Sequence, residues 1–415
     1  MIQSGLAEAE SLFEREIGMK KIGIICEYNP FHSGHAYQIK QIRKRESNAA
    51  IVCLMSGHAT QRGELAIADK YTRAAMAVSC GADVVLELPY PYCSASAAYF
   101  AGAGVAILDA LGVDELSFGS ECADLQLLTQ TAAMMETTEF YERVRNRQKC
   151  GEGSAQAYFA ELQACVSLSE YRFLANDILA LSYVRAIRAL ESEMVPCPLK
   201  REGSAYHAKE TEQGKHPSAT ALRTLLHQGY VNDSLHFIPK EAQKHLLNAK
   251  KGGLFPANME RLDRAVLAFF RLNQPQALDG IAEMQGGLAN RLHTAALENH
   301  SLSAMLTAAS SKSYPTARLR RAVLYAMTGV MTEDLQNPPG YLLLLSAGER
   351  GRLVLRDWKR NSPIPIVTKF ADAACLSAAA ARQSALSQAL DALFTLALPT
   401  PYASNALVKQ SPYML

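Results

Sequence analysis

The sequence predicts an α/β protein in which a parallel sheet with helices on both faces is followed by a mainly α-helical C-terminal part. Short apolar runs, typical of buried strands, alternate with segments of helical length from residue 21 to residue 199. Strands that are separated by helices in this way form parallel sheets. After residue 253 the helical pattern prevails, which predicts the second part.

Five short runs are the expected strands, at 21–26, 50–55, 83–88, 114–118 and 195–199. The expected helices have suitable length and composition and lie at 34–45, 69–80, 95–111, 259–272, 277–299, 317–328 and 377–396. The segment 121–190 is mostly helical, with Asn176 or Asp177 as the N-cap of its last helix. A further helix begins at Ser218, and the Lys-Lys-Gly-Gly stretch at 250–253 resembles a linker.

The composition is that of an ordinary soluble protein, with 415 residues, 49% hydrophobic and 20% charged. No window approaches the roughly 18 consecutive apolar residues of a membrane span, and the acidic residues 1–18 lack the features of a signal peptide. These residues are expected to form a short helical extension, and Met19 could serve as an alternative start. Nine cysteines without a Cys-x-x-Cys pair favour a reducing cytoplasm over a disulfide framework or a structural zinc site.

Positive charge is concentrated in the C-terminal part. From Pro256 onward there are 16 Lys and Arg against 11 Asp and Glu, whereas the preceding residues have 26 against 29. The overall net charge of +2 does not by itself indicate a protein that binds nucleic acid. Its distribution points to the helical part as the one that would meet a polyanion.

Two histidines, His32 and His35, follow the first expected strand in the segment GIICEYNPFHSGH. Parallel sheets bind ligands at the carboxyl ends of their strands, and a helix N-terminus presents free N–H groups to an anion. Gly34 allows close approach of the backbone, and the two imidazoles can donate to phosphate oxygens. A phosphate site is therefore favoured over a metal site, for which nearby Cys or His partners are missing, and over histidines that serve only the core.

Polar residues also follow other expected strands. His58 and Arg62 come after the second strand and Arg201 ends the fifth, so all three are expected at the same edge of the sheet. The helix that begins at Ser218 adds hydroxyl and amide groups, and Arg223 adds a positive charge, which together suit an anion. Each of these features also has a simpler interpretation. The segment with His58 and Arg62 could be a solvated loop, and Arg201 could be a surface arginine. Ser218 could be an ordinary helix cap, with Arg223 in solvent.

These segments together resemble the tRNA(Met) cytidine acetate ligase family of HIGH-type nucleotidyltransferases, which carry a His-x-Gly-His motif after the first strand. The resemblance extends from Lys20 over nearly the whole chain. Besides the histidine segment it rests on MSGHATQRGE (55–64), DVVLELPY (83–90), FGSE (118–121), NDILALSYVRAI (176–187), KREGSAYH (200–207) and SATALR (218–223).

The resemblance implies three parts: an N-terminal extension (1–18), a Rossmann-like HIGH nucleotidyltransferase domain (19–253) and a helical domain (254–415) that helps to bind tRNA. It also implies an ATP-dependent ligase that forms acetyl-adenylate and pyrophosphate. The acetyl group would then pass to the wobble cytidine of elongator tRNA(Met), giving N4-acetylcytidine. Mg²⁺ is expected to accompany ATP, although no side chain can be identified as its ligand.

The resemblance further implies roles for individual residues. His32, His35 and Arg223 are expected to be catalytic, because they would stabilise negative charge on the phosphates. The residues expected to contact ATP are Ile25, Cys26, Glu27, Tyr28, Asn29, Pro30, Phe31, His32, Ser33, Gly34, His35, Ala36, Tyr37, Gln38, Gly119, Asn176 and Arg201.

Two basic groups in the C-terminal part are expected to contact the phosphate backbone of tRNA. One group lies on the expected helix 317–328, and the other surrounds Trp358. The residues expected to bind tRNA are Arg318, Arg321, Arg352 and Lys359. A solvated helix face is the simpler interpretation of both groups.

Two other functions remain open from the sequence. An adenylyltransferase that acts on a small phosphorylated metabolite would use the same His-x-Gly-His chemistry, but it would not need the long basic helical part. A nucleotide-binding, tRNA-associated protein without catalysis is the other alternative. The presence of His32, Gly34, His35 and Arg223 argues against it.

Overall fold

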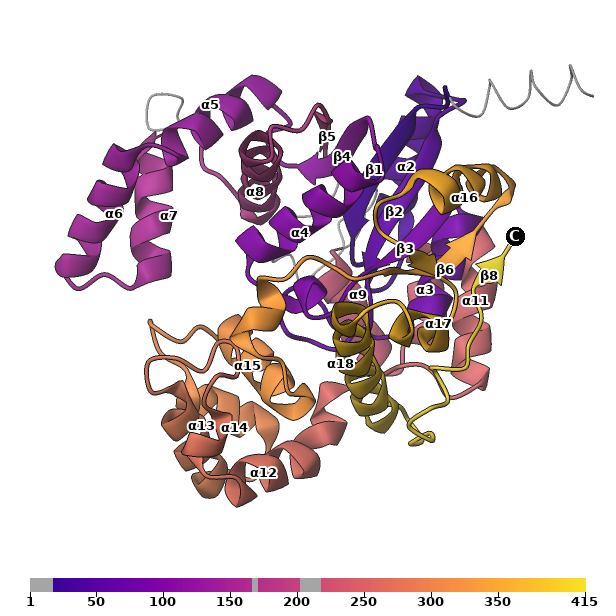
Figure 1. Ribbon diagram of the computed structural model, residues 1–415. Coiled ribbons are helices and arrows are strands. Elements are labelled where there is room, and N and C mark those ends of the chain that lie inside the picture. The colour runs from indigo at the N-terminus through magenta and orange to yellow at the C-terminus, as the bar shows by residue number, and fades with distance from the viewer. Residues whose placement is uncertain (1–17, 166–170, 202–217) are drawn as a thin grey trace, which may run out of the picture.

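The centre of the protein is an eight-stranded sheet, seen in a computed structural model that describes residues 18–165, 171–201 and 218–415 (Figure 1). The strand order is β5-β4-β1-β2-β3-β6-β7, and β8 pairs with β6. The strands are β1 (Lys21–Cys26), β2 (Ala50–Ser56), β3 (Val84–Leu88), β4 (Glu115–Ser120), β5 (Val195–Lys200), β6 (Leu342–Ala347), β7 (Ile366–Val367) and β8 (Tyr413–Met414).

The five predicted strands are confirmed as β1 to β5, and they pair parallel to one another. β1 lies between β2 and β4, with Ile24 opposite Cys53 and Gly23 opposite Leu116. β2 and β3 are buried throughout, which explains why their sequences are mainly apolar, with Glu87 of β3 as a buried charged residue. Parallel pairing places the carboxyl ends of these strands at one edge, and His32 follows β1 there.

The sheet also takes strands from the C-terminal part, where only helices are expected from the sequence. β6 pairs antiparallel with β3, and β7 and β8 pair parallel with β6. The β6 segment LLLLSA is buried throughout, so its apolar side chains are accommodated by the sheet. The domain boundary at residue 253 stays a prediction, but the sheet itself crosses that position.

Helices cover both faces of the sheet. Successive residues of a strand point to opposite faces, so neighbouring residues of β1 belong to two different cores. On one face Ile25 packs in a core that includes residues of α4 (Ala97–Ala110) and α8 (Ala175–Ala189). On the other face Ile24 belongs to a second core. The helices α2 (Ser33–Arg45), α3 (Lys70–Ser79), α9 (Ala219–His227), α11 (Lys240–Lys251) and α17 (Phe370–Ala374) contribute to that second core. Figure 1 shows α4 and α3 on opposite sides of the strands.

The connection between β4 and β5 is mostly helical, as predicted. α5 (Leu125–Met135) packs against α8, whereas α6 (Thr138–Lys149) and α7 (Ser154–Cys165) pair with each other. The α6–α7 pair projects away from the sheet (Figure 1). α8 then returns the chain to β5, at the edge of the sheet.

The C-terminal helices pack beside and against the sheet (Figure 1). Besides α17, they are α12 (Asp263–Leu272), α13 (Leu288–Glu298), α14 (Leu302–Ala309), α15 (Thr316–Thr328), α16 (Glu349–Asn361) and α18 (Ala378–Leu396), and the short α10 (Val231–Ser234) precedes α11. The helix predicted at 277–299 is wrong in its first half. Gly280, Gly286 and Gly287 there have φ values of 82°, 76° and 84°, which are incompatible with a right-handed helix.

Some sequence predictions lie outside the described residues. These are the helical extension, apart from Gly18, and most of the KREGSAYH segment. In the part of the chain that the structure describes, no helix has the length and apolar character needed to cross a bilayer.

Candidate active site

The segment after β1 forms a compact turn that leads directly into α2. Tyr28 has a φ of 46°, and the Asn29–Pro30 peptide bond is cis. Asn29 Oδ1 accepts a hydrogen bond from the Ile67 N–H at 2.7 Å, and the buried rings of Tyr28 and Phe31 are 4.9 Å apart. The turn places His32 at the N-cap of α2, the strand-end position that the sequence predicts.

His32 and His35 form a capping box at the start of α2. His32 Nδ1 accepts a hydrogen bond from the Gly34 N–H at 3.0 Å, and His35 Nδ1 accepts one from the His32 N–H at 3.2 Å. Because each Nδ1 is an acceptor, each neutral ring carries its proton on Nε2. The two rings stack with their centroids 3.8 Å apart. The pair thus offers two Nε2–H donors to an anion.

Burial lowers the pKa of His35 well below its ordinary value, and the positive charges of Arg201 and of His32 in its protonated form act in the same direction. An unfolded histidine titrates near pH 6.5, so below about that pH the unfolded chain binds a proton more readily and this group lowers the stability of the folded protein.

We expect a neutral His35 with its proton on Nε2 at any pH above about 6.5. Ring ¹⁵N chemical shifts, assigned with a His35→Ala variant, would check this. A titration midpoint at or above about pH 6.5 would contradict it.

The N-terminus of α9 borders the same cavity as the histidines. Ser218 is the N-cap, as predicted, and its side chain accepts a hydrogen bond from the first turn of the helix. Arg223 Nη1 donates to the Asn29 carbonyl at 3.0 Å, and its Nη2 lies 3.6 Å from Glu64 Oε2. These contacts hold the guanidinium beside the turn between β1 and α2 that carries His32 (the histidine turn). There it can attract an anion together with the N-terminus of α9.

Gly119 and Arg201 form another part of the cavity wall. Arg201 directly follows β5, and its N–H donates to the Ser120 carbonyl at 3.1 Å. A Cβ on Gly119 would lie 3.3 Å from Arg201 Cγ, so the missing side chain leaves room for the arginine. The side chain of Arg201 is 44% exposed, and it brings a second guanidinium to the cavity.

The predicted N-cap of α8 is wrong, since the cap is Leu174 and Asn176 lies within the first turn. Asn176 Nδ2 donates to Glu121 Oε1 at 2.5 Å. The buried Asp177 carboxylate accepts hydrogen bonds from the Tyr171 hydroxyl at 2.7 Å and from three backbone N–H groups at 2.8 to 3.1 Å. Burial alone would raise the pKa of Asp177, but these bonds outweigh it and hold that pKa below its ordinary value. Asp177 therefore stays ionised, and its hydrogen bonds hold the residues that follow β4 against the start of α8.

These elements enclose a cavity of about 260 Å³ at the carboxyl edge of the sheet. Most of the predicted ATP contacts line it, namely Ile25, Cys26, Glu27, Tyr28, Asn29, His32, Gly34, His35, Tyr37, Gln38, Gly119, Asn176 and Arg201, and so does Arg223. The predicted contacts Pro30, Phe31, Ser33 and Ala36 are not among the lining residues. The turn buries Pro30 and Phe31, and a helix rotates successive residues by about 100°, so a continuous range cannot face one cavity.

Comparisons with a family model and with known proteins point to the same family. A model of the HIGH Nucleotidyl Transferase family matches residues 19–407. The tRNA(Met) cytidine acetate ligase of Syntrophotalea carbinolica is 36% identical over 362 residues, which cover 85% of this chain and 85% of that protein. The protein of the same name from Caldanaerobacter subterraneus is 32% identical, covering 85% of this chain and 89% of that protein. The chain belongs to the tRNA(Met) cytidine acetate ligase family.

Two crystal structures agree with membership of the tRNA(Met) cytidine acetate ligase family. Thermotoga maritima TmcAL in an apo form superposes with a TM-score of 0.87 at 27% identity, covering 96% of this chain and 100% of that chain. The same protein bound with alpha-thio ATP gives a TM-score of 0.85 at 26% identity, covering 95% and 100%. The Rossmann-like HIGH nucleotidyltransferase fold, with a mainly helical C-terminal part, is thereby confirmed.

Several lining residues are absent from the ATP contacts that resemblance to the ligase family implies. They are Ile24, Thr60, Arg62, Glu64, Phe100, Phe118, Leu179, Tyr183, Leu199, Lys200, Ser218, Ala219 and Thr220. Thr60, Arg62 and Glu64 alternate along one loop inside MSGHATQRGE, a segment that carries the resemblance, so the sequence held a signal for them. Phe118 and Tyr183 contribute an apolar wall, and nothing in the sequence distinguishes them from ordinary core aromatics.

His58 of the same segment lies just beyond the end of β2, but it does not line the cavity. It is fully buried, and its Nδ1 lies 2.6 Å from Asp391 Oδ1. Its Nε2 accepts a hydrogen bond from the Lys70 N–H at 3.1 Å. The expectation that His58 meets a ligand is therefore wrong, because α18 packs against it and supplies its partner.

The residues expected to bind tRNA lie on two separate helices, α15 and α16 (Figure 1). On α15, Arg321 is buried, and Arg318 and Arg321 pair with Glu283 at 3.1 and 2.7 Å. On α16, Arg352 donates to the carbonyl of the last residue at 2.8 Å, whereas Lys359 is exposed. Binding of tRNA by these residues stays a prediction, and the pairing with Glu283 makes Arg321 the least accessible of them.

Carboxylates are few in the cavity of this ligase-family protein. Glu27 Oε1 accepts a hydrogen bond from the Gln61 N–H at 2.8 Å, and Glu64 Oε1 lies 2.5 Å from Arg320 Nη1. Within residues 18–165, 171–201 and 218–415, no group of three or more His, Cys, Asp and Glu side chains could hold a metal ion. The donors present therefore do not form a metal site without a ligand's oxygens.

Proposed function

We propose that this protein is an ATP-dependent acetate ligase that acetylates the wobble cytidine of elongator tRNA(Met) through acetyl-adenylate. Membership of the tRNA(Met) cytidine acetate ligase family supports the reaction class and the substrates. One structural observation supports the site: two Nε2–H donors, the N-terminus of α9 and the guanidiniums of Arg201 and Arg223 border a single cavity. Such a set suits a triphosphate.

In the first step an acetate oxygen attacks the α-phosphorus of ATP, and pyrophosphate leaves. His32 and His35 donate through Nε2 to phosphate oxygens, and Arg201 and Arg223 offset the negative charge that develops there. The hydrogen bonds at each Nδ1 hold the imidazoles in place before ATP binds. The contribution of the protein is thus mainly positional and electrostatic.

The protein itself supplies no nucleophile in this proposal. Cys26 is the cysteine that lines the cavity, and burial raises the pKa of its thiol well above the ordinary value. A thiol with such a pKa stays protonated near neutral pH and is a poor nucleophile. Direct attack by acetate is therefore favoured over a thioester on Cys26.

In the second step the exocyclic amine of cytidine attacks the acyl carbon of acetyl-adenylate, and AMP leaves. We expect Mg²⁺ to enter with ATP, held by phosphate oxygens and water, as is typical of this ion. We place the reaction in the cytoplasm and assign tRNA contacts to the basic C-terminal part, including Arg352 and the exposed Lys359.

Labelled acetate tests the proposed function. The protein is incubated with ATP, labelled acetate and elongator tRNA(Met), and the tRNA is then digested to nucleosides. We expect label in N4-acetylcytidine and release of AMP and pyrophosphate in equal amounts. A tRNA(Met) with uridine at the wobble position is the matched control and should take up no label.

The same assay separates the alternatives. Pyrophosphate release driven by nicotinamide mononucleotide or phosphopantetheine, without label in tRNA, would favour a small-metabolite adenylyltransferase. No reaction with either set of substrates would favour a protein that binds nucleotide without catalysis.

A further inference from the structure

The loop between β2 and α3, residues 57–69, contacts the cavity on one side and C-terminal helices on the other. Thr60, Arg62 and Glu64 of this loop line the cavity. α15 and α18 contact the same loop from outside. We propose that these two helices position the loop, and that Arg320 of α15 is a positioning residue for ATP although it does not line the cavity. This inference rests on the proposed function, because it takes ATP as the ligand.

Glu64 links α15 to the cavity. Its Oε1 lies 2.5 Å from Arg320 Nη1, and its Oε2 lies 3.6 Å from Arg223 Nη2. A carboxylate shared by two guanidiniums neutralises each of them only in part. Without Arg320, Glu64 would be left with Arg223 and would offset more of its charge. Arg320 thereby keeps Arg223 positive toward bound phosphates.

Close backbone packing fixes the tip of the loop against α15. Gly63 has a φ of 72°, and a Cβ there would lie 2.5 Å from the Arg321 backbone nitrogen. Only glycine satisfies both conditions without strain. The Gly63 N–H donates to the Thr60 carbonyl, and the Thr60 N–H donates to the Glu64 carbonyl, both at 2.9 Å. The tip is therefore a tight turn whose position depends on α15.

A buried charge cluster anchors the ends of the loop to α18. Its members are His58, Lys70, Glu87 and Asp391, and all four side chains are buried. His58 Nε2 accepts from the Lys70 N–H, so Nδ1 carries the proton and donates to Asp391. Lys70 Nζ lies 3.1 Å from Asp391 Oδ2 and 3.0 Å from Glu87 Oε2. The loop cannot shift at these ends without separating buried charges.

An Arg320→Ala variant tests this inference with ATP alone, in the absence of tRNA. We expect the dissociation constant for ATP to rise about three- to tenfold, because Glu64 would then offset more of the Arg223 charge that faces the phosphates. Arg320→Lys keeps a positive charge beside Glu64 and should recover most of the affinity. In a Glu64→Gln background the Arg320→Ala change should alter the affinity by less than about twofold, since the link to Arg223 is already gone.

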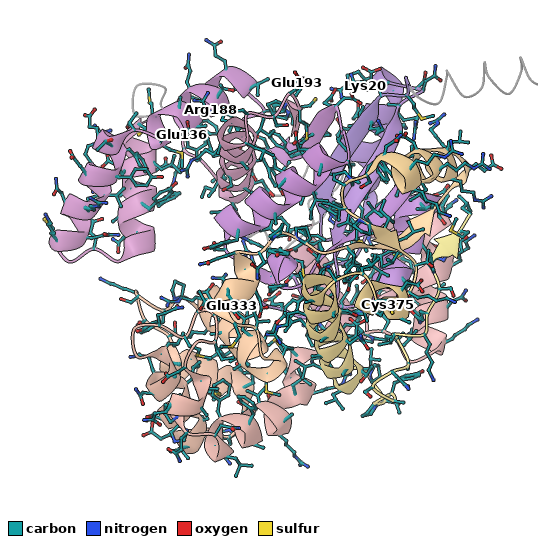
Figure 2. The ribbon with its side chains drawn as sticks, in the orientation of Figure 1. Lys20, Glu136, Arg188, Glu193, Glu333 and Cys375 are labelled. Carbon is teal, nitrogen blue, oxygen red and sulfur yellow. The ribbon has the colours of Figure 1, made fainter. Side chains whose placement is uncertain are left out.

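The matched control is Arg188→Ala. Arg188 pairs with Glu136 at 3.0 Å, with 42% of its side chain exposed against 33% for Arg320, and Figure 2 shows this pair beside α8. This control should bind ATP as the wild type does. Equal ATP affinity of Arg320→Ala and wild type, or an equal loss in Arg320→Ala and Arg188→Ala, would overturn the inference. A wild-type protein that does not bind ATP would instead overturn the proposed function itself.

Discussion

Replacing His35 with alanine is expected to slow acetate-dependent exchange between ATP and pyrophosphate by about a hundred- to a thousandfold. The change removes one of the two Nε2–H donors that the capping box holds at the cavity. The donor acts on charge that develops as acetate attacks, so the loss should appear mainly in kcat. Measuring exchange without tRNA confines the result to the first step.

Two further variants give this prediction its controls. In His35→Gln the side-chain amide can place a donor near the former Nε2, so this variant should keep more activity than His35→Ala. His300 is exposed beyond the end of α13, and His300→Ala should exchange at the wild-type rate. A folded His35→Ala protein that retains exchange within about threefold of wild type would contradict the assigned role.

Replacing Asp391 with alanine is expected to lower the free energy of unfolding by about 3–5 kcal/mol. Asp391 is buried, receives the His58 Nδ1–H at 2.6 Å and pairs with Lys70, whose side chain is fully buried. Its removal leaves a buried donor without an acceptor and a buried ammonium with Glu87 as its remaining carboxylate partner in the cluster. Urea denaturation, followed by circular dichroism, measures the change.

The matched control for this prediction is Asp372→Ala. Asp372 is exposed on α17, so its loss should change the stability by less than about 1 kcal/mol. Asp391→Asn keeps the size of the side chain and an acceptor for His58, and it should fall between the two. A loss below about 1 kcal/mol for Asp391→Ala would show that the cluster does not fasten α18 to the loop.

The histidine turn is predictable from the sequence because the residues that make it are neighbours in the chain. The strand, the Asn-Pro turn, Gly34 and the two histidines all lie within one short segment. Their hydrogen bonds join residues only two or three positions apart. The strand pattern similarly places Gly119 and Arg201 at the same edge, since parallel strands end together.

Other features depend on contacts between distant segments, and the sequence alone does not reveal them. His58 and its partner Asp391 are 333 positions apart, so a histidine in a ligand-like motif is in fact buried by a C-terminal helix. Arg318 and Arg321 resemble a free basic face, yet Glu283 from another segment pairs with both. The apolar run of β6 forms a strand that pairs with β3, which lies far from it in the sequence.

Oxygen-18 in both carboxylate positions of acetate gives the most direct test of the central claim, that acetate attacks the α-phosphorus of ATP in this cavity. The protein is allowed to acetylate elongator tRNA(Met), and the AMP and pyrophosphate are analysed by mass spectrometry. If acetyl-adenylate forms, the oxygen that bridges to phosphorus stays with AMP when the cytidine amine takes the acetyl group. We therefore expect one oxygen-18 atom in each AMP and none in pyrophosphate. AMP without the label, or label in pyrophosphate, would contradict the mechanism.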